Sequence, residues 1–324
     1  MSSSNGITAQ KQRFSVAITT ESYKKLISNT LQDPARAQRF VASITSAVAV
    51  NPALQECTAP TIIAGALLGE SLNLSPSPQL GQYYLVPFKC KVKDANGRIV
   101  YATDANGNRV KDEEGHWIPI TETKAQFVLG YKGYIQLAIR SGQYQDIDVM
   151  EIREGEYLGK DPMTGKPRFQ FIEDDEIRDS LPVVGYMGYF EYLNGFRKVL
   201  YWSKEKMLNH ADTYSSAFSA KAYKDIQAGK VADADMWKYS SYWYKNFDDM
   251  AKKTLLRQLI SRWGIMSIEM QKGFVEDSNF IQVGSNGDLV SDTEGQTEAE
   301  QPEPAPPAAA PAAEPAEAVN LADL

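Results

Sequence analysis

The stretch KAQFVLGYKGYIQLAIRSGQY, residues 124–144, decides how this chain folds. Its first half, residues 125–129, is a short apolar run closed by a glycine, which predicts a buried strand. Its second half, residues 133–140, predicts a helix, because apolar side chains recur every three or four residues along one face. The sequence therefore predicts a strand that turns at once into an amphipathic helix.

Two glycines and two cations give this junction its candidate chemistry. Gly130 and Gly133 permit a sharp turn and a close approach of the backbone to a ligand. Lys132 and Arg140 lie on one line of the helix, and a helix N-terminus beside cations suits a phosphate. The alternative is an ordinary strand-to-helix turn with solvated cations. This stretch alone does not separate the two interpretations.

Two dense blocks of sequence resemble a known family. GYKGYIQLAIRSGQY, residues 130–144, closely resembles the segment GYrGmidLArRSGqi of the RecT family, the phage single-strand annealing proteins. Residues 240–270 resemble the family's W…eMAKKTaiRrlfkylPvSiE, with matches at Trp243, Met250, Ala251, Lys252, Lys253, Thr254 and Arg257. Gly264 stands near the family's proline, so we expect this helix to end differently.

Thinner matches join the two blocks. The run LNLSPSPQLGQYYLVPF, residues 72–88, is similar to a family segment that precedes a Tyr-Leu-x-Pro-Phe strand. Residues 153–156, Arg-Glu-Gly-Glu, are similar to the family's VREGDeF. The resemblance thus covers most of residues 72–272.

The resemblance implies a DNA single-strand annealing protein of phage or prophage origin. Such proteins coat resected single strands and pair them with their complement without hydrolysing ATP. The implied partners are single-stranded DNA, the annealed duplex, further copies of the chain in a ring or helical filament, a 5′→3′ exonuclease and a host single-strand binding protein. No cofactor is required, and we expect Mg²⁺ to stimulate annealing by screening the two backbones.

Lysines and arginines interleaved with aromatic residues are the candidate DNA-binding groups. Such surfaces bind single strands through backbone charge and base stacking, each stacked base contributing roughly 1–3 kcal/mol. The candidate phosphate-binding residues are Lys132, Arg140, Arg153, Lys198, Lys252, Lys253 and Arg257. Most aromatic residues belong to the core by default, and the stacking candidates are Tyr131, Tyr134 and Trp243.

Composition limits the class of protein. The 324 residues, 43% of them hydrophobic, suffice for one large or two modest domains. There is no run of 18 apolar residues and no signal sequence in MSSSNGITAQKQRF, so we expect a soluble protein of the bacterial host cytoplasm. Two cysteines without a CxxC motif fit a reducing cytosol, and with two histidines they argue against a zinc site.

Charge is distributed unevenly along the chain. The net charge is −7, but residues 284–324 contain nine acidic residues and no lysine or arginine, which leaves +2 for residues 1–283. Between residues 197 and 272 there are fourteen lysines and arginines against eight acidic residues. This asymmetry is typical of a basic functional surface with an acidic tail.

We expect an α+β fold, with helices packed on a small antiparallel sheet that carries β-hairpins. Residues 1–15 should be disordered, residues 16–283 should form the domain for annealing and oligomerisation, and residues 284–324 should be a disordered Pro/Ala/Glu-rich tail. The tip of the tail, residues 319–324, is either a docking peptide or merely solubilising. Polar residues 211–240 suggest a mobile connection that orders on DNA.

Asn-Gly pairs predict the hairpin turns. Asn194-Gly195 separates two aromatic-rich strands in residues 183–202 and predicts a type I′ turn. Asn96-Gly97 and Asn106-Gly107 predict an extended hairpin arm within residues 94–120. The arm is either surface decoration or a contact with substrate or another subunit.

No recognised catalytic motif occurs in the sequence. The nearest phosphate-loop match, Gly159 to Lys166, has the wrong spacing and is followed by Pro167, which favours a hairpin turn. The pairs Asp174-Asp175 and Asp248-Asp249 could serve a metal-dependent nuclease, but acidic residues also favour helix starts. A non-enzymatic annealing protein is therefore preferred over two alternatives, a nuclease and a self-assembling structural phage protein.

Overall fold

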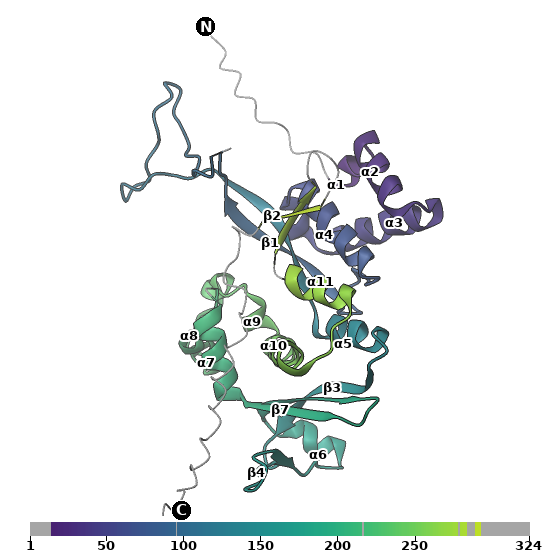
Figure 1. Cartoon of the computed structure of the whole chain (residues 1–324). Helices are drawn as coiled ribbons and strands as arrows, with labels where there is room; N and C mark the ends of the chain where they lie inside the picture. Colours follow the sequence, from purple (N-terminus) through teal and green to yellow (C-terminus); the bar gives the residue numbers. More distant parts are fainter. Residues whose placement is uncertain (1–13, 95, 216, 278, 284–288, 293–324) are drawn as a thin grey trace, which may run out of the picture.

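The computed structural model describes residues 14–94, 96–215, 217–277, 279–283 and 289–292 (Figure 1). It confirms the α+β fold with small antiparallel sheets. The three sheets have the strand orders β1-β2-β8-β9, β3-β6-β7 and β4-β5, and every pairing between named strands is antiparallel. None of the helices in the described ranges has the length and apolar content needed to span a bilayer.

Most helices and strands follow one another with short connections, and residues 92–120 form a long connection between β1 and β2. The helices are α1 (Phe14–Ala17), α2 (Glu21–Leu31), α3 (Pro34–Val50), η1 (Pro52–Glu56), α4 (Ala59–Ser71), α5 (Tyr131–Arg140), α6 (Asp175–Ser180), α7 (Lys204–Tyr214), α8 (Ala220–Gln227), η2 (Asp233–Lys238), α9 (Tyr242–Lys245), α10 (Phe247–Trp263) and α11 (Ile268–Glu276). The strands are β1 (Tyr83–Lys91), β2 (Thr121–Leu129), β3 (Tyr144–Arg153), β4 (Tyr157–Lys160), β5 (Pro167–Phe169), β6 (Val183–Tyr192), β7 (Arg197–Ser203), β8 (Phe280–Val283) and β9 (Leu289–Asp292).

The first sheet packs on the N-terminal helices. β1 and β2 pair without interruption from Tyr83 opposite Leu129 to Lys91 opposite Thr121. Helix α4 lies against them and buries nine of its thirteen residues, because its apolar side chains surround it on every side. The contact is close, since a Cβ added at Gly65 would lie 2.7 Å from the Leu85 side chain.

The second sheet packs on the C-terminal helices. Helix α10 contacts β3, β6 and β7, and Leu255 and Leu259 reach the backbone at Gly188, where a Cβ would be 3.4–3.5 Å away. Residues 124–144 join the two sheets, because β2 ends one of them, α5 follows, and β3 begins the other. Figure 1 shows α5, α10 and α11 in the layer between the two sheets.

The Asn-Gly turns differ in type from the prediction. In the β6–β7 hairpin, Tyr192 N–H donates to Phe196 O and Gly195 N–H donates to Tyr192 O, while Gly195 has φ +80°. A type I′ turn needs positive φ at both central residues, and Asn194 does not have it. The three-residue turn therefore places only the glycine in the left-handed region. The same pattern occurs in the arm, which has three such turns where the sequence predicted two.

Two segments are more ordered than predicted. Within residues 211–240, the end of α7, helix α8 and η2 take the place of the expected mobile connection. Helix α8 is stabilised in two ways: the Ser219 side chain caps its N-terminus, and Tyr223 on the helix is buried. Strand β9 pairs with β8 and lies beyond residue 283, where the domain was expected to end. The predictions for residues 1–13 and for the tail after Asp292 concern residues outside the described ranges.

Candidate nucleic-acid interface

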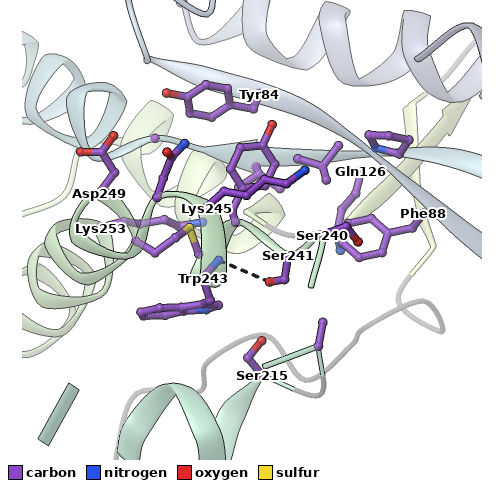
Figure 2. Close-up of a pocket in the computed structure, with 18 of the residues that line it drawn as sticks. Tyr84, Phe88, Gln126, Ser215, Ser240, Ser241, Trp243, Lys245, Asp249 and Lys253 are labelled. Carbon is purple, nitrogen blue, oxygen red and sulfur yellow. Dashed lines mark hydrogen bonds between the residues drawn. The ribbon is translucent and has the colours of Figure 1, made fainter. Parts of the chain in front are cut away.

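A cleft of about 790 Å³ opens between strands β1 and β2 and the segment that contains η2, α9 and the start of α10. Its lining combines aromatic rings with cationic side chains. The aromatic residues include Tyr84, Phe88, Tyr131 and Tyr242, and the cationic residues are Lys89, Lys238, Lys245, Lys253 and Arg257. Figure 2 shows Tyr84 and Phe88 on the strand side of the cleft and Lys245 and Asp249 on the helix side.

Strand alternation places the rings on the β1 wall. Successive side chains of a strand point to opposite faces, so Tyr84 and Phe88 line the cleft while Tyr83 and Leu85 enter the core. Tyr242 on α9 meets Tyr84 across the cleft with ring centroids 6.1 Å apart. The cleft therefore has aromatic rings on both walls.

Lysines at the cleft supply positive charge. Lys89 and Lys245 are exposed and take part in no ion pair within the described part of the chain. Lys238 pairs with Asp235 at 2.8 Å, with about half of each side chain exposed, so solvent screens that pair. Asp249 is the acidic residue on the helix wall, and its carboxylate pairs with Lys252 at 3.1 Å.

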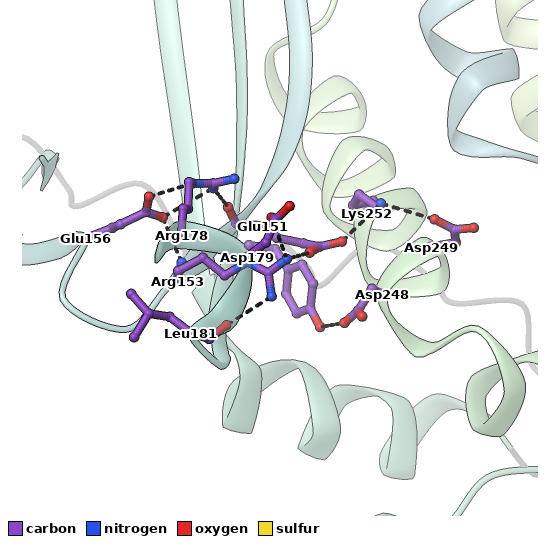
Figure 3. A network of polar contacts seen from close by, with 10 residues as sticks. Glu151, Arg153, Glu156, Arg178, Asp179, Leu181, Asp248, Asp249 and Lys252 are labelled. Atoms are coloured by element: carbon purple, nitrogen blue, oxygen red, sulfur yellow. Dashed lines mark hydrogen bonds and ion pairs between the residues drawn. The ribbon is translucent and has the colours of Figure 1, made fainter. Parts of the chain in front are cut away.

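Lys252 is held between two carboxylates beside the cleft. Its Nζ lies 3.3 Å from Glu151 and 3.1 Å from Asp249 (Figure 3). The same Nζ lies 5.0 Å from the centroid of the Tyr131 ring. Burial alone would lower the pKa of Lys252, but Asp249, Tyr131 and Glu151 together raise it above its ordinary value. Lys252 therefore stays charged beside Tyr131, which lines the cleft.

Lys253 and Arg257 line the cleft and converge on one buried carboxylate, that of Asp277, which lines it too. Asp277 is 1% exposed and lies 3.0 Å from Lys253 Nζ and 2.8 Å from Arg257 NH1. It also accepts hydrogen bonds from the Leu129 backbone N–H at 2.8 Å and the Tyr134 hydroxyl at 2.9 Å. Burial would raise the pKa of Asp277, but the two cations hold it below its ordinary value. This network joins β2, α5, α10 and the end of α11.

This chain is similar to proteins of a known family. The RecT family model matches residues 38–283, which includes β1, β2, α5 and α10. The chain belongs to the RecT family. It is 33% identical over 242 residues to the uncharacterized protein YqaK of Bacillus subtilis (strain 168), a match that covers 75% of this chain and 64% of YqaK. The chain thus spans less than two thirds of the length of that relative.

A second relative carries the family's name. The chain is 23% identical over 266 residues to Protein RecT of Escherichia coli (strain K12), a match that covers 80% of this chain and 78% of that protein. The matched ranges include both dense blocks that the sequence singled out. In this RecT-family chain the first block forms the junction of the two sheets, and the second forms α9 and α10.

Arg153 lies in a polar network of this RecT-family fold away from the cleft lining (Figure 3). Its guanidinium pairs with Glu151 at 3.1 Å and Asp179 at 3.7 Å and donates to Leu181 O at 3.1 Å. Its backbone N–H donates to the buried carboxylate of Glu156, which Arg178 also contacts at 2.7 Å. The Arg-Glu-Gly-Glu match therefore marks a turn stabilised by its own ion pairs.

The other predicted phosphate-binding residues lie apart from one another. Lys132 is exposed and follows Tyr131 at the cleft. Arg140 is also exposed, at the far end of α5, and donates to Leu72 O at 2.9 Å. Lys198 lies on β7 with its Nζ 4.3 Å from the centroid of the Trp263 ring. Of the seven predicted cations, Lys253 and Arg257 line the cleft. Four of the seven are paired with carboxylates, namely Arg153, Lys252, Lys253 and Arg257.

Two of the predicted stacking residues, Tyr131 and Trp243, line the cleft, and they differ in exposure. Tyr134 is 0% exposed and Trp243 is 3% exposed, so neither ring has a face open to a base. Trp243 packs on Phe247 and anchors α9. Tyr131 is half-buried and lines the cleft. The sequence analysis missed Tyr84, Phe88 and Tyr242, although alternation along β1 was a signal that could have found the first two.

The two glycines of the junction serve packing within the protein. A Cβ at Gly130 would lie 2.2 Å from Gly81 O, and one at Gly133 would lie 2.1 Å from Gln82 O. The backbone that approaches these glycines closely is therefore that of Gly81 and Gln82, just before β1. No ligand is needed to explain why glycine stands at these two positions.

Both aspartate pairs begin helices. Asp174 caps α6 by accepting from Ile177 N–H at 3.0 Å, and Asp248, in the first turn of α10, accepts from the Tyr186 hydroxyl. Across the ranges that the structure describes, no three His, Cys, Asp or Glu side chains are grouped as a metal site would require. The helix-start interpretation of the two pairs agrees with these contacts.

Proposed function

We propose that this chain binds single-stranded DNA in the cleft between β1–β2 and α9–α10 and anneals complementary strands without ATP. Membership of the RecT family supports a role in single-strand annealing recombination. The observation that carries the proposal is the lining of the cleft, where Tyr84, Tyr131 and Tyr242 lie among exposed lysines. Rings and cations in one groove are the combination that binds single strands with little sequence preference.

In this proposal the lysines hold phosphates and the strand is kept extended. Lys89 approaches the DNA strand from the β1 wall of the cleft, and Lys245 approaches it from α9. Lys132 lies next to Tyr131 at the start of α5. The outward base edges remain available to a complementary strand. Base-pair steps contribute on the order of 1.4 kcal/mol each, so a duplex of moderate length forms without a chemical fuel.

Several further features belong to the same proposal. Copies of the chain act together along one strand, in a ring or a helical filament. A 5′→3′ exonuclease supplies the single strands, and a host single-strand binding protein meets the same DNA. Mg²⁺ is not required but stimulates annealing by screening the two phosphate backbones. The protein holds and presents strands and performs no covalent chemistry on them.

Fluorescence-monitored annealing of complementary oligonucleotides, with and without nucleotide, tests the proposal. We expect the protein to accelerate annealing equally in both cases. The variant Lys89→Gln/Lys245→Gln should slow it and reduce the slope of log K against log salt by roughly 0.7 per lost contact on single strands.

Lys25→Gln is the matched control, because Lys25 is an exposed cation on α2 outside the cleft lining. It should behave as wild type in both assays. A need for hydrolysable ATP, cleavage of labelled strands in Mg²⁺, or an unchanged salt slope in the folded double variant would each contradict the proposal.

A further inference from the structure

The arm, residues 92–120, projects from the ends of β1 and β2 away from both sheets (Figure 1). Two closed rings of backbone hydrogen bonds hold its three hairpins together. In the first ring, Val92 N–H donates to Ile120 O, Ile120 N–H to Val100 O, and Val100 N–H to Val92 O, each at 2.9 Å. In the second, Ala102, Ile118 and Val110 are linked in the same way at 2.8–3.0 Å. The arm is therefore a hydrogen-bonded element in which the three hairpins are joined to one another.

Each hairpin of the arm is closed by the same turn. Asp94, Asp104 and Asp112 each accept hydrogen bonds from the backbone N–H groups two and four residues later, at 2.8–3.1 Å. The glycine three residues after each aspartate has a φ between +76° and +87°, which glycine adopts without strain. These three acidic side chains are thus occupied in holding the turns.

Lysines continue from the cleft onto the arm. Between residues 89 and 120 there are six lysines and arginines and five acidic residues, three of which are the turn aspartates while Glu113 and Glu114 lie at the tip of the third hairpin. Lys89 and Lys91 occupy alternate positions of β1, about 6.8 Å apart in an extended antiparallel chain, and Lys93 follows two residues later at the start of the arm.

Two aromatic rings on the arm lie beside cations. The Arg109 guanidinium is 4.8 Å from the centroid of the Tyr101 ring, and Lys111 Nζ is 4.6 Å from the centroid of the Trp117 ring. Trp117 is 44% exposed although it is large and apolar. Exposed rings next to cations are typical of surfaces that bind single strands by stacking and charge together.

We propose that the arm is a second binding element for single-stranded DNA, which takes the strand where it leaves the cleft. The inference rests on the proposed function of the cleft, because Lys89 both lines the cleft and begins the row of lysines that leads onto the arm. Lys91 and Lys93 contact phosphates, and Trp117 contacts a base. The arm thereby lengthens the DNA site of each subunit beyond the cleft.

Oligonucleotides of two lengths separate the arm from the cleft. The arm variant is Lys91→Gln/Lys93→Gln/Arg109→Gln/Lys111→Gln, and the matched control is Lys25→Gln/Lys160→Gln/Lys166→Gln/Arg168→Gln, which removes four exposed cations from α2 and the β4–β5 hairpin. On oligo-dT of about 40 nucleotides, the arm variant should lose at least about tenfold in affinity and roughly 2–3 in salt slope, at roughly 0.7 per contact.

The short probe and the control decide how a loss is interpreted. On oligo-dT of about 8 nucleotides, which the cleft alone accommodates, the arm variant should match wild type, and the control variant should match wild type on both probes. Equal losses on both probes, or an unchanged slope on the long probe, would overturn the inference. So would a change confined to the sedimentation of the DNA-free protein, because the arm would then be a contact between subunits.

Failure of the cleft proposal has a different signature. Lys89→Gln/Lys245→Gln should weaken binding of the short probe, which the arm variant leaves unchanged. If the cleft variant binds the short probe as wild type does while the arm variant still loses affinity for the long one, the arm binds DNA and the cleft does not. If wild type binds neither probe, both proposals are wrong.

Discussion

Replacing Asp277 by asparagine tests the conclusion that two of the family-matched cations support the fold. Asp277 is the buried carboxylate that Lys253, Arg257, Tyr134 and the Leu129 backbone N–H all contact. Asparagine keeps the size of the side chain but removes its charge. The side chains of Lys253 and Arg257, 7% and 11% exposed, are then left without their counter-charge.

The expected loss of stability is large. Removing one partner of a buried ion pair costs about 3–5 kcal/mol, because the remaining charge stays buried without compensation. At about 2–4 °C of melting temperature per kcal/mol for a large domain, the melting temperature should fall by about 6–20 °C. The folded-state pKa of Asp277 is lowered, so its contribution is complete above the unfolded value of about 3.9 and disappears as the pH falls through the folded value. The two proteins should therefore differ most near neutral pH and converge in acid.

Thermal unfolding followed by circular dichroism between pH 3 and pH 8 measures this difference. Asp235→Asn is the matched control, because the Asp235–Lys238 pair is also short, at 2.8 Å, but about half of each side chain is exposed. Such a pair contributes about 0–1 kcal/mol, so the control should lose at most a few degrees. Equal shifts in the two variants, or a shift for Asp277→Asn that does not depend on pH, would refute the reasoning.

Gly130→Ala should destabilise the protein by about 2 kcal/mol or more in urea unfolding, because its Cβ would lie 2.2 Å from Gly81 O. Gly188→Ala, where the nearest atom is 3.4 Å away, should change stability by less than about 1 kcal/mol, and the reverse order would contradict the packing argument. Removing residues 293–324, which carry seven acidic residues and no lysine or arginine, should keep or raise affinity for single strands, most clearly at low salt in fluorescence titrations. Lost binding together with a lower melting temperature would instead make that segment part of the domain.

Local sequence by itself determined several elements of this protein. Asp33 and Pro34 predict the start of α3, where the Asp33 carboxylate accepts from Ala35 N–H at 2.9 Å. Ser203 likewise predicts the start of α7, and the apolar run before Gly130 predicts β2. These signals depend on backbone groups and side chains a few residues apart, which the sequence displays directly. The two dense blocks also sufficed to recognise the RecT family.

Tertiary structure alone decided which charged and aromatic residues face solvent. Lys252 and Lys253 are adjacent in sequence, yet one reaches Glu151, 101 residues earlier, and the other reaches Asp277, 24 residues later. Helical periodicity separates the directions of the two side chains by about 100°. It does not predict which carboxylate each side chain contacts. The cleft has the same origin, because Tyr84 and Tyr242 meet only when both sheets have packed on the helices between them. Whether a cation is held by a carboxylate depends on contacts that are remote in sequence, so only the folded chain shows which cations are engaged.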